Sequence, residues 1–147
     1  MKEHTRNRAF WGLALVCVLV FALASLASAE SKAKPIVLGC PVSMGVAYGP
    51  DARDALSLAI KQINAAGGVN VGGKKRPFKL VIEDTRAMEP GVPVTDALLG
   101  LERLITAMHA DFLVGGPVRS EASFAGWNLM NKYKKISIIT SGTYGPK

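Results

Sequence analysis

The strongest constraint on the fold is an alternation of short apolar runs with longer segments of helical periodicity, which begins near residue 35. The apolar runs are four to six residues long, which suits strands buried on both faces. They lie at 35–40, 78–82, 111–115 and 136–139. Four such strands separated by three helices predict an α/β fold of order β-α-β-α-β-α-β, in which right-handed crossovers give a parallel sheet with helices on both faces.

Each intervening segment has its own boundary signals. In the first, Asp51 is expected to cap a helix that Gly67-Gly68 ends. Its apolar side chains recur at helical spacing and predict one inward face: Ala52, Ala55, Leu56, Ala59, Ile60 and Ile63. The second helix is expected to cover 94–108, and the third to follow Ser120 as N-cap. A glycine pair precedes Lys74-Lys75-Arg76, which predicts a solvated hairpin tip.

The first 29 residues have the pattern of a secretory signal peptide. Three basic residues precede an unbroken apolar stretch at 10–24, and Ala27-Ser28-Ala29 places small residues where signal peptidase cleaves. We therefore expect cleavage after Ala29 and a periplasmic mature chain. A membrane anchor is the alternative, because 21 uncharged residues approach the roughly 20 that span a bilayer. A lipoprotein signal at Cys17 has less support, because that residue lies inside the apolar run.

Composition narrows the function of residues 30–147. They contain 15 basic and 10 acidic residues, and this net charge of +5 is scattered rather than arranged in a stripe interleaved with aromatic residues, so nucleic-acid binding is not expected. Cys40 has no partner for a disulfide and is expected to pack in a strand. One His and one Cys cannot form a familiar metal cluster, and we expect no metal or cofactor.

Chemistry is expected in the loops at the carboxyl ends of the strands, where parallel sheets bind ligands. These loops are 41–50, 116–120 and 141–144. The second leads into a helix N-terminus, which favours anions, so that Ser120 and Arg119 can bind a carboxylate. The equal alternative is that Ser120 only caps the helix and Arg119 points into water.

Enzyme signatures do not emerge from the sequence. The glycines fit neither the dinucleotide nor the P-loop fingerprint. Glu83 and Asp84 are adjacent at a strand end, so they are expected to point apart and to serve structural roles. No nucleophile, base and orienting group come together, and the chain is expected not to be an enzyme.

Several segments together resemble the type I periplasmic ligand-binding proteins of the branched-chain amino acid (Leu/Ile/Val) class. The first is the run Ile36-Val-Leu-Gly-Cys-Pro-Val-Ser-Met-Gly with Ala47-Tyr48-Gly49 after it. The most specific is Ile63-Asn-Ala-Ala-Gly-Gly68, which joins a helix end and a turn. Three later segments also resemble strands of that family: Leu80-Val-Ile-Glu-Asp84, Phe112-Leu-Val-Gly-Gly116 and Ile138-Ile-Thr-Ser-Gly142.

The resemblance implies two α/β lobes that close over a small solute and deliver it to the permease of an ABC importer. Membrane contact is then expected only through the signal peptide or that permease. The resemblance also implies a set of ligand-binding residues in the first lobe: Tyr48, Arg119, Ser120, Ser141, Gly142 and Thr143. Arg119 departs from the small hydroxyl residues common in amino-acid binders, so an organic or aromatic acid, or an amide, is an alternative to an amino acid.

Length is the larger departure. Two lobes of ordinary domain size need roughly 350 residues, whereas residues 30–147 form the N-terminal part of lobe I. The resemblance therefore implies a truncated fragment. A ligand-sensing domain and, less favoured, a doubly wound enzyme are the other functions compatible with this fold.

Overall fold

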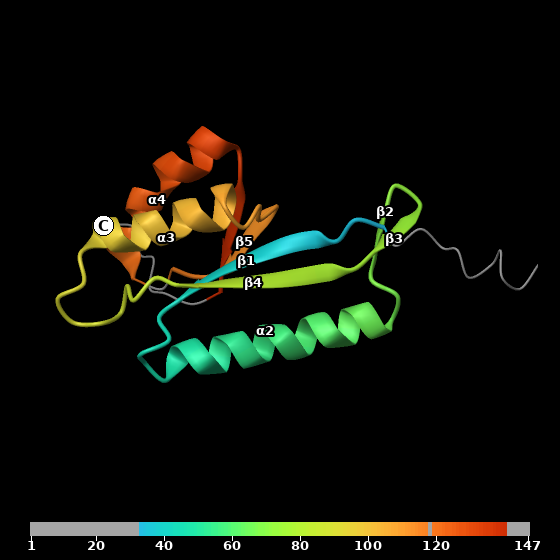
Figure 1. The fold of residues 1–147 in the computed structure, drawn as a ribbon, viewed down its shortest axis with the longest axis horizontal. Helices are drawn as coiled ribbons and strands as arrows, with labels where there is room; N and C mark the ends of the chain where they lie inside the picture. The colour runs from blue at the N-terminus through green and yellow to red at the C-terminus, as the bar shows by residue number, and fades with distance from the viewer. Residues whose placement is uncertain (1–32, 118, 141–147) are drawn as a thin grey trace, which may run out of the picture. The chain divides into compact units, whose positions relative to one another are not determined.

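The computed structural model describes residues 33–117 and 119–140, and the expected signal peptide lies outside the described residues. These described residues form two sheets and three helices (Figure 1). Their order is β1 (Ile36–Val42), α2 (Tyr48–Ala65), β2 (Val69–Val71), β3 (Lys74–Arg76), β4 (Phe78–Asp84), α3 (Val94–Thr106), β5 (Phe112–Gly115), α4 (Ser120–Tyr133) and β6 (Ile136–Ile139). The predicted parallel α/β fold is confirmed.

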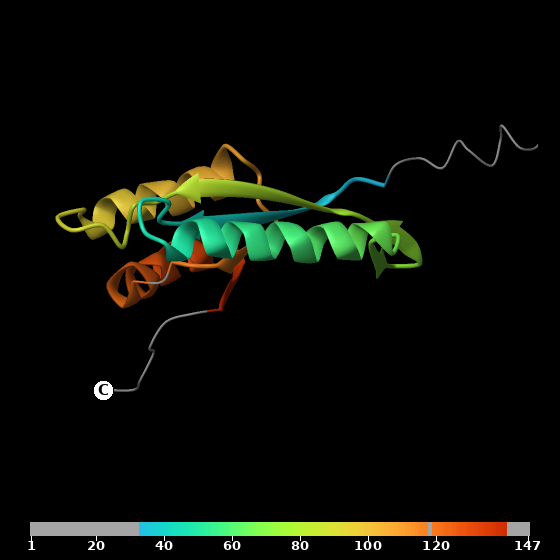
Figure 2. The ribbon, with the colours of Figure 1, turned by 90° about the horizontal axis from the view of Figure 1, so that it is seen from below.

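The four-stranded sheet has the order β4-β1-β5-β6, and all its neighbours pair in parallel. The chain moves from β1 to β4 through α2, then passes back across β1 to β5 through α3. As a result α2 lies on one face of the sheet, lengthwise along β1 and β4, while α3 and α4 lie on the other (Figures 1 and 2). The loops after β1 and β5 therefore leave neighbouring strand ends toward opposite faces, which creates the switch point where such sheets bind ligands.

The main core lies between the sheet and α3. Leu101 and Leu104 on α3 and Leu113 on β5 are at most 1% exposed. Gly39 on β1 makes this close packing possible, because a β-carbon there would lie 2.8 Å from a methyl of Leu113 and 2.9 Å from the β-carbon of Ala110. Close-packed interiors leave no room for that extra carbon.

The helix starts differ from the sequence prediction. Helix α2 begins at Tyr48 rather than after Asp51, and its N-cap is Ala47, whose side chain cannot cap. Pro50 is compatible with this earlier start because the first turn of a helix needs no N–H from that residue. Helix α4 begins at Ser120 itself, so Ser120 is not the N-cap that the sequence predicted.

The predicted inward face of α2 is also only partly buried. Of its members Ile60 is buried, whereas Ile63 is 39% exposed. The reason is that α2 packs mainly on β1 and β4. On the same face, Phe112 of β5 and Ile136 and Ile138 of β6 are 37%, 59% and 56% exposed, so half of this sheet face carries no helix among the described residues.

The hairpin β2–β3 is antiparallel, and its turn consists of Gly72 and Gly73, both with positive φ. This confirms the predicted hairpin tip. Within the described ranges, no helix is long and apolar enough to cross a membrane.

Candidate functional site

Three segments that are distant in sequence meet at the carbonyl oxygen of Gly115, where β5 ends. The Tyr48 hydroxyl donates to this oxygen over 3.3 Å from the start of α2. The Thr140 hydroxyl donates to it over 3.2 Å from the residue after β6. One backbone acceptor thus joins the loop after β1, the end of β5 and the end of β6, and it fixes their relative positions at the carboxyl edge of the sheet.

The side chain of Cys40 on β1 packs next to Gly115. Its side chain is fully buried, and a β-carbon on Gly115, which has φ +100°, would lie 3.1 Å from the Cys40 sulfur. Burial raises the pKa of the Cys40 thiol to about 11. The thiol therefore stays protonated at neutral pH and is no nucleophile, which agrees with the packing role expected from the sequence.

The loop after β1 is held by side chains of the following elements. The Asp84 carboxylate at the end of β4 accepts from the backbone N–H of Met44 over 3.0 Å and of Arg86 over 3.2 Å. The buried Ser43 hydroxyl accepts from the N–H of Met88 over 2.9 Å. The loops after β1 and β4 are therefore bound to each other, which orients the start of α2.

The neighbouring carboxylate, Glu83, points elsewhere. Its carboxylate accepts from the Nε of Arg103 on α3 over 2.9 Å, whereas the Asp84 carboxylate accepts from backbone N–H groups of the loops after β1 and β4. The prediction that these two carboxylates point apart and act structurally is confirmed. Across residues 33–117 and 119–140, no group of three or more His, Cys, Asp or Glu side chains is placed to hold a metal ion.

The turn between β5 and α4 is stabilised from within. The Ser123 hydroxyl, on the first turn of α4, donates to the Pro117 carbonyl over 2.6 Å and lies 3.3 Å from the Arg119 carbonyl. Both carbonyls precede the helix, so this serine ties the turn to α4. The first backbone N–H groups of α4 start from this edge, where the helix dipole favours an anion.

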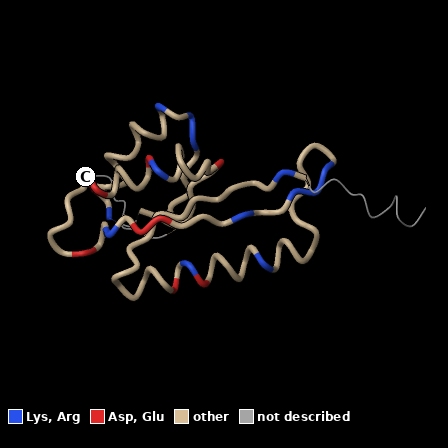
Figure 3. The backbone as a smooth tube through the Cα atoms, in the orientation of Figure 1, with Lys and Arg blue, Asp and Glu red and all other residues tan. Residues whose placement is uncertain are grey.

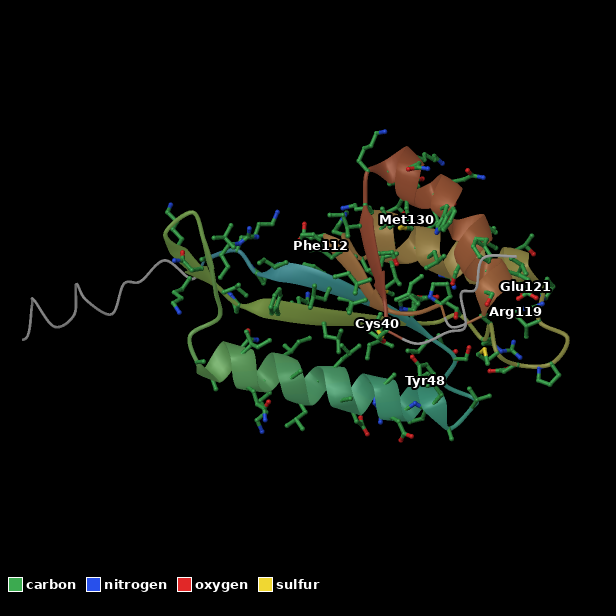
Figure 4. The ribbon with its side chains drawn as sticks, turned by 180° about the vertical axis from the view of Figure 1, so that it is seen from behind. Cys40, Tyr48, Phe112, Arg119, Glu121 and Met130 are labelled. Carbon is green, nitrogen blue, oxygen red and sulfur yellow. The ribbon has the colours of Figure 1, made fainter. Side chains whose placement is uncertain are left out.

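Arg119 is held by protein groups rather than pointing into water. Its guanidinium donates to the Val92 carbonyl over 2.9 Å and lies 3.4 Å from the Glu121 carboxylate. It thus joins the loop after β4 to the first turn of α4, near the edge where Figure 4 shows Tyr48 at the start of α2. A ligand carboxylate would have to compete with these partners for the guanidinium.

The other predicted site residues are only partly placed. Tyr48 is half-buried at this edge, and Ser120 is the first residue of α4. Ser141, Gly142 and Thr143 lie outside the described residues. Thr140 and Ser123 also shape the edge, although neither was predicted from the sequence. The available signal for Thr140 was a hydroxyl residue directly after a predicted strand, while the bonds of Ser123 depend on how the chain turns before α4.

A cavity of about 190 Å³ lies beside this edge, between α4 and the sheet. Its lining is mostly apolar and includes Leu113, Trp127, Met130 and Ile139. The hydroxyl of Ser123, which also lines it, already donates to Pro117. Ser137 is the other polar residue of the lining, and no charged side chain is among the residues that line the cavity. The loop edge, with a helix N-terminus and Arg119, is therefore the better candidate site for a carboxylate.

No protein-family model matches the chain. Solved structures do match it. The branched-chain amino acid transporter substrate binding protein LivJ from Streptococcus pneumoniae, in complex with isoleucine, is 26% identical, with a TM-score of 0.60 over 75% of this chain and 30% of LivJ. A putative branched-chain amino acid ABC transporter from Silicibacter pomeroyi is 27% identical, with a TM-score of 0.57 over 70% of this chain and 24% of its own. The chain is similar to branched-chain amino acid substrate-binding proteins.

A further substrate-binding protein, the ABC transporter protein from Sphaerobacter thermophilus, shares the fold at 23% identity, with a TM-score of 0.57 over 75% of this chain and 27% of its own. The matches to LivJ and to the Silicibacter pomeroyi protein confirm the resemblance to branched-chain amino acid substrate-binding proteins. These neighbours are substrate-binding proteins rather than enzymes. The chain spans between 24% and 30% of their lengths, so it corresponds to a partial domain of such a protein.

Proposed function

We propose that the chain forms part of the first lobe of an extracytoplasmic solute-binding protein, and that this protein delivers a small amino acid or carboxylate to the permease of an ABC importer. The observation that carries the proposal is the likeness to LivJ, whose structure contains isoleucine. Residues 30–147 would supply one wall of the ligand cleft, and the opposite wall would come from a second lobe.

The geometry of the carboxyl edge supports a carboxylate ligand. The α4 N-terminus presents backbone N–H groups, and the bonds from Tyr48 and Thr140 to Gly115 hold the neighbouring segments in place. Positions fixed before binding reduce the entropy lost when a ligand is ordered. In this proposal Tyr48 and the α4 start, with Ser141, Gly142 and Thr143 beyond the described residues, contact the ligand.

The partners of Arg119 distinguish between two classes of ligand, an amino acid and an organic or aromatic acid. Because its guanidinium already bonds to Val92 and Glu121, we favour an amino acid whose carboxylate is held by backbone N–H groups. The alternative is an organic or aromatic acid, for which Arg119 would leave these partners and form a charged pair with the carboxylate.

The test is a ligand titration of the isotopically labelled chain, in which NMR measures the chemical shifts of the backbone amides. L-Isoleucine should shift the amides of 115–123 to a saturating value. The expected affinity is only millimolar, because one wall of a cleft buries little of a ligand. The methyl ester of L-isoleucine, which lacks the carboxylate, is the matched control and should leave them unchanged. No shift up to about 50 mM, where a Kd near 10 mM would still be visible, refutes the proposal. Equal shifts with the ester refute the carboxylate site.

Export is part of the same proposal. The chain would pass through the membrane with residues 1–29 as its signal and would be cleaved after Ala29. The mass of the exported protein tests this directly. A product that begins at Glu30 supports cleavage, and a product that retains the apolar run indicates an anchored protein instead.

A further inference from the structure

The end of the sheet opposite the candidate site is strongly basic. The hairpin β2–β3 and the amino ends of β1 and β4 carry five Lys and Arg residues, which we call the basic end: Lys34, Lys74, Lys75, Arg76 and Lys79. Between residues 55 and 82 the sequence contains no Asp or Glu. Figure 3 shows several Lys and Arg residues at this end. Asp111 lies close to it, because its carboxylate accepts from the backbone N–H of Val37 over 2.8 Å near the start of β1.

Arg76 holds the basic end together. Its Nε donates to the Lys34 carbonyl over 2.8 Å, and its second guanidinium nitrogen donates to the Pro35 carbonyl over 3.2 Å. These bonds fix the hairpin beside the start of β1. The four lysines are exposed, and among the described residues none of them forms an ion pair. Cations that lack protein partners are available to an external anionic surface.

The hairpin tip adds an apolar group to this charge. Val71 pairs with Lys74 across the hairpin and is 42% exposed. An apolar side chain opposite a lysine matches the boundary between lipid headgroups and acyl chains, where lysines reach phosphates and the valine enters the apolar layer.

We propose that the basic end docks on the anionic lipid headgroups of the membrane across which the chain is exported. This extends the membrane contact expected from the sequence, which was limited to the signal peptide and the permease. It does not depend on the identity of the ligand, because the candidate site lies at the opposite edge of the sheet. A polyanion such as DNA is the competing partner that the experiment must separate.

The test uses the full chain inserted through its apolar run into vesicles of phosphatidylcholine, with or without about 30% phosphatidylglycerol. Amide hydrogen exchange is measured at 70–76, and helix α4 serves as internal reference. We expect exchange at the hairpin to be at least about threefold slower in the anionic vesicles, and this protection to vanish at high salt. Equal exchange in both kinds of vesicle overturns the proposal.

Two double variants with equal changes in net charge localise the effect. Lys74→Glu/Lys75→Glu should abolish the lipid-dependent protection, whereas Arg53→Glu/Arg86→Glu, at positions away from the basic end, should retain it. If Lys74→Glu/Lys75→Glu impairs folding, judged by circular dichroism, Lys34→Glu/Lys79→Glu replaces it. If both double variants lose the lipid-dependent protection equally, the protection responds to net charge alone, and the proposal that the basic end is the docking face is overturned. Equal protection by a DNA duplex added to neutral vesicles would overturn the choice of lipid.

Discussion

Replacing Gly49 by alanine tests whether close backbone packing sets the start of α2 and, with it, the candidate site. A β-carbon at this position would lie 2.7 Å from the carbonyl carbon of Ser43 and 3.0 Å from the α-carbon of Met44. Ordinary contacts of this kind are 3.4–4 Å, and the colliding atoms belong to the backbone, so no side chain can rotate away. The start of α2 must therefore move by more than half an ångström, and Tyr48 moves with it.

The cost follows from this displacement. Overpacking of a close contact costs about 1–3 kcal/mol, and weakening the bond from Tyr48 to Gly115 adds about 1 kcal/mol. Alanine returns up to about 1 kcal/mol through its higher helix propensity. We expect a net loss of about 2 kcal/mol in the free energy of unfolding, which for a domain of this size lowers Tm by roughly 10 °C.

Gly45→Ala in the same loop is the matched control. A β-carbon there meets the Glu89 carboxylate oxygen at 2.5 Å, but this is the tip of a flexible side chain on the surface. Rotating it away disturbs an exposed ion pair with Arg86 and costs at most about 0.5–1 kcal/mol. Urea denaturation followed by circular dichroism measures both variants. If Gly49→Ala and Gly45→Ala differ by less than about 0.5 kcal/mol, the argument from backbone packing is refuted.

Three further predictions concern the same edge. Thr140→Val should lower the free energy of unfolding by about 0.5–1 kcal/mol and Thr140→Ser by almost nothing, whereas Thr140→Val combined with Tyr48→Phe should lower it by more than the sum of the single variants, because the Gly115 carbonyl then loses both hydroxyl donors. Additive values in urea denaturation would contradict this. Because the pKa of Cys40 is raised in the folded state, its contribution to the free energy of unfolding should be fully present below pH 9 and should be lost as pH rises toward about 11. Cys40→Ala should lack this decrease in stability, and identical pH profiles of the two proteins would disprove the prediction. Arg119→Gln should lower the free energy of unfolding by about 1 kcal/mol and speed proteolysis of the loop after β4, but it should leave the affinity for L-isoleucine within about threefold if backbone N–H groups hold the carboxylate. A loss of affinity above tenfold would instead assign the carboxylate to Arg119.

The elements that the sequence predicted well are those whose signal is local. The strand predicted at 136–139 coincides with β6, and the strands predicted at 78–82 and 111–115 lie within two residues of β4 and β5. Burial on both faces requires a continuous apolar run, so composition alone reveals these strands. Helix α3 was predicted within two residues, because its apolar stripe packs on the sheet along most of its length.

The start of α2 could not be read in this way. Its position depends on Gly49 packing against the backbone of Ser43, a contact between segments that local preferences do not encode. Asp51 was a reasonable cap by residue type, and the structure places it in the first turn, where its charge still favours the helix dipole. Similarly, the predicted inner face of α2 assumed a fully covered sheet, whereas β5 and β6 leave half of that face open.

Local patterns in the amino-acid sequence were enough to predict the class of fold, a signal-like N-terminal segment and the family resemblance, because apolar periodicity and turn residues are local properties. The strand order, the meeting of Tyr48 and Thr140 at the carbonyl of Gly115, and the bond from Arg119 to Val92 could be seen only in the folded chain. These are long-range contacts, whose geometry arises only when the crossovers bring distant strand ends to one edge of the sheet.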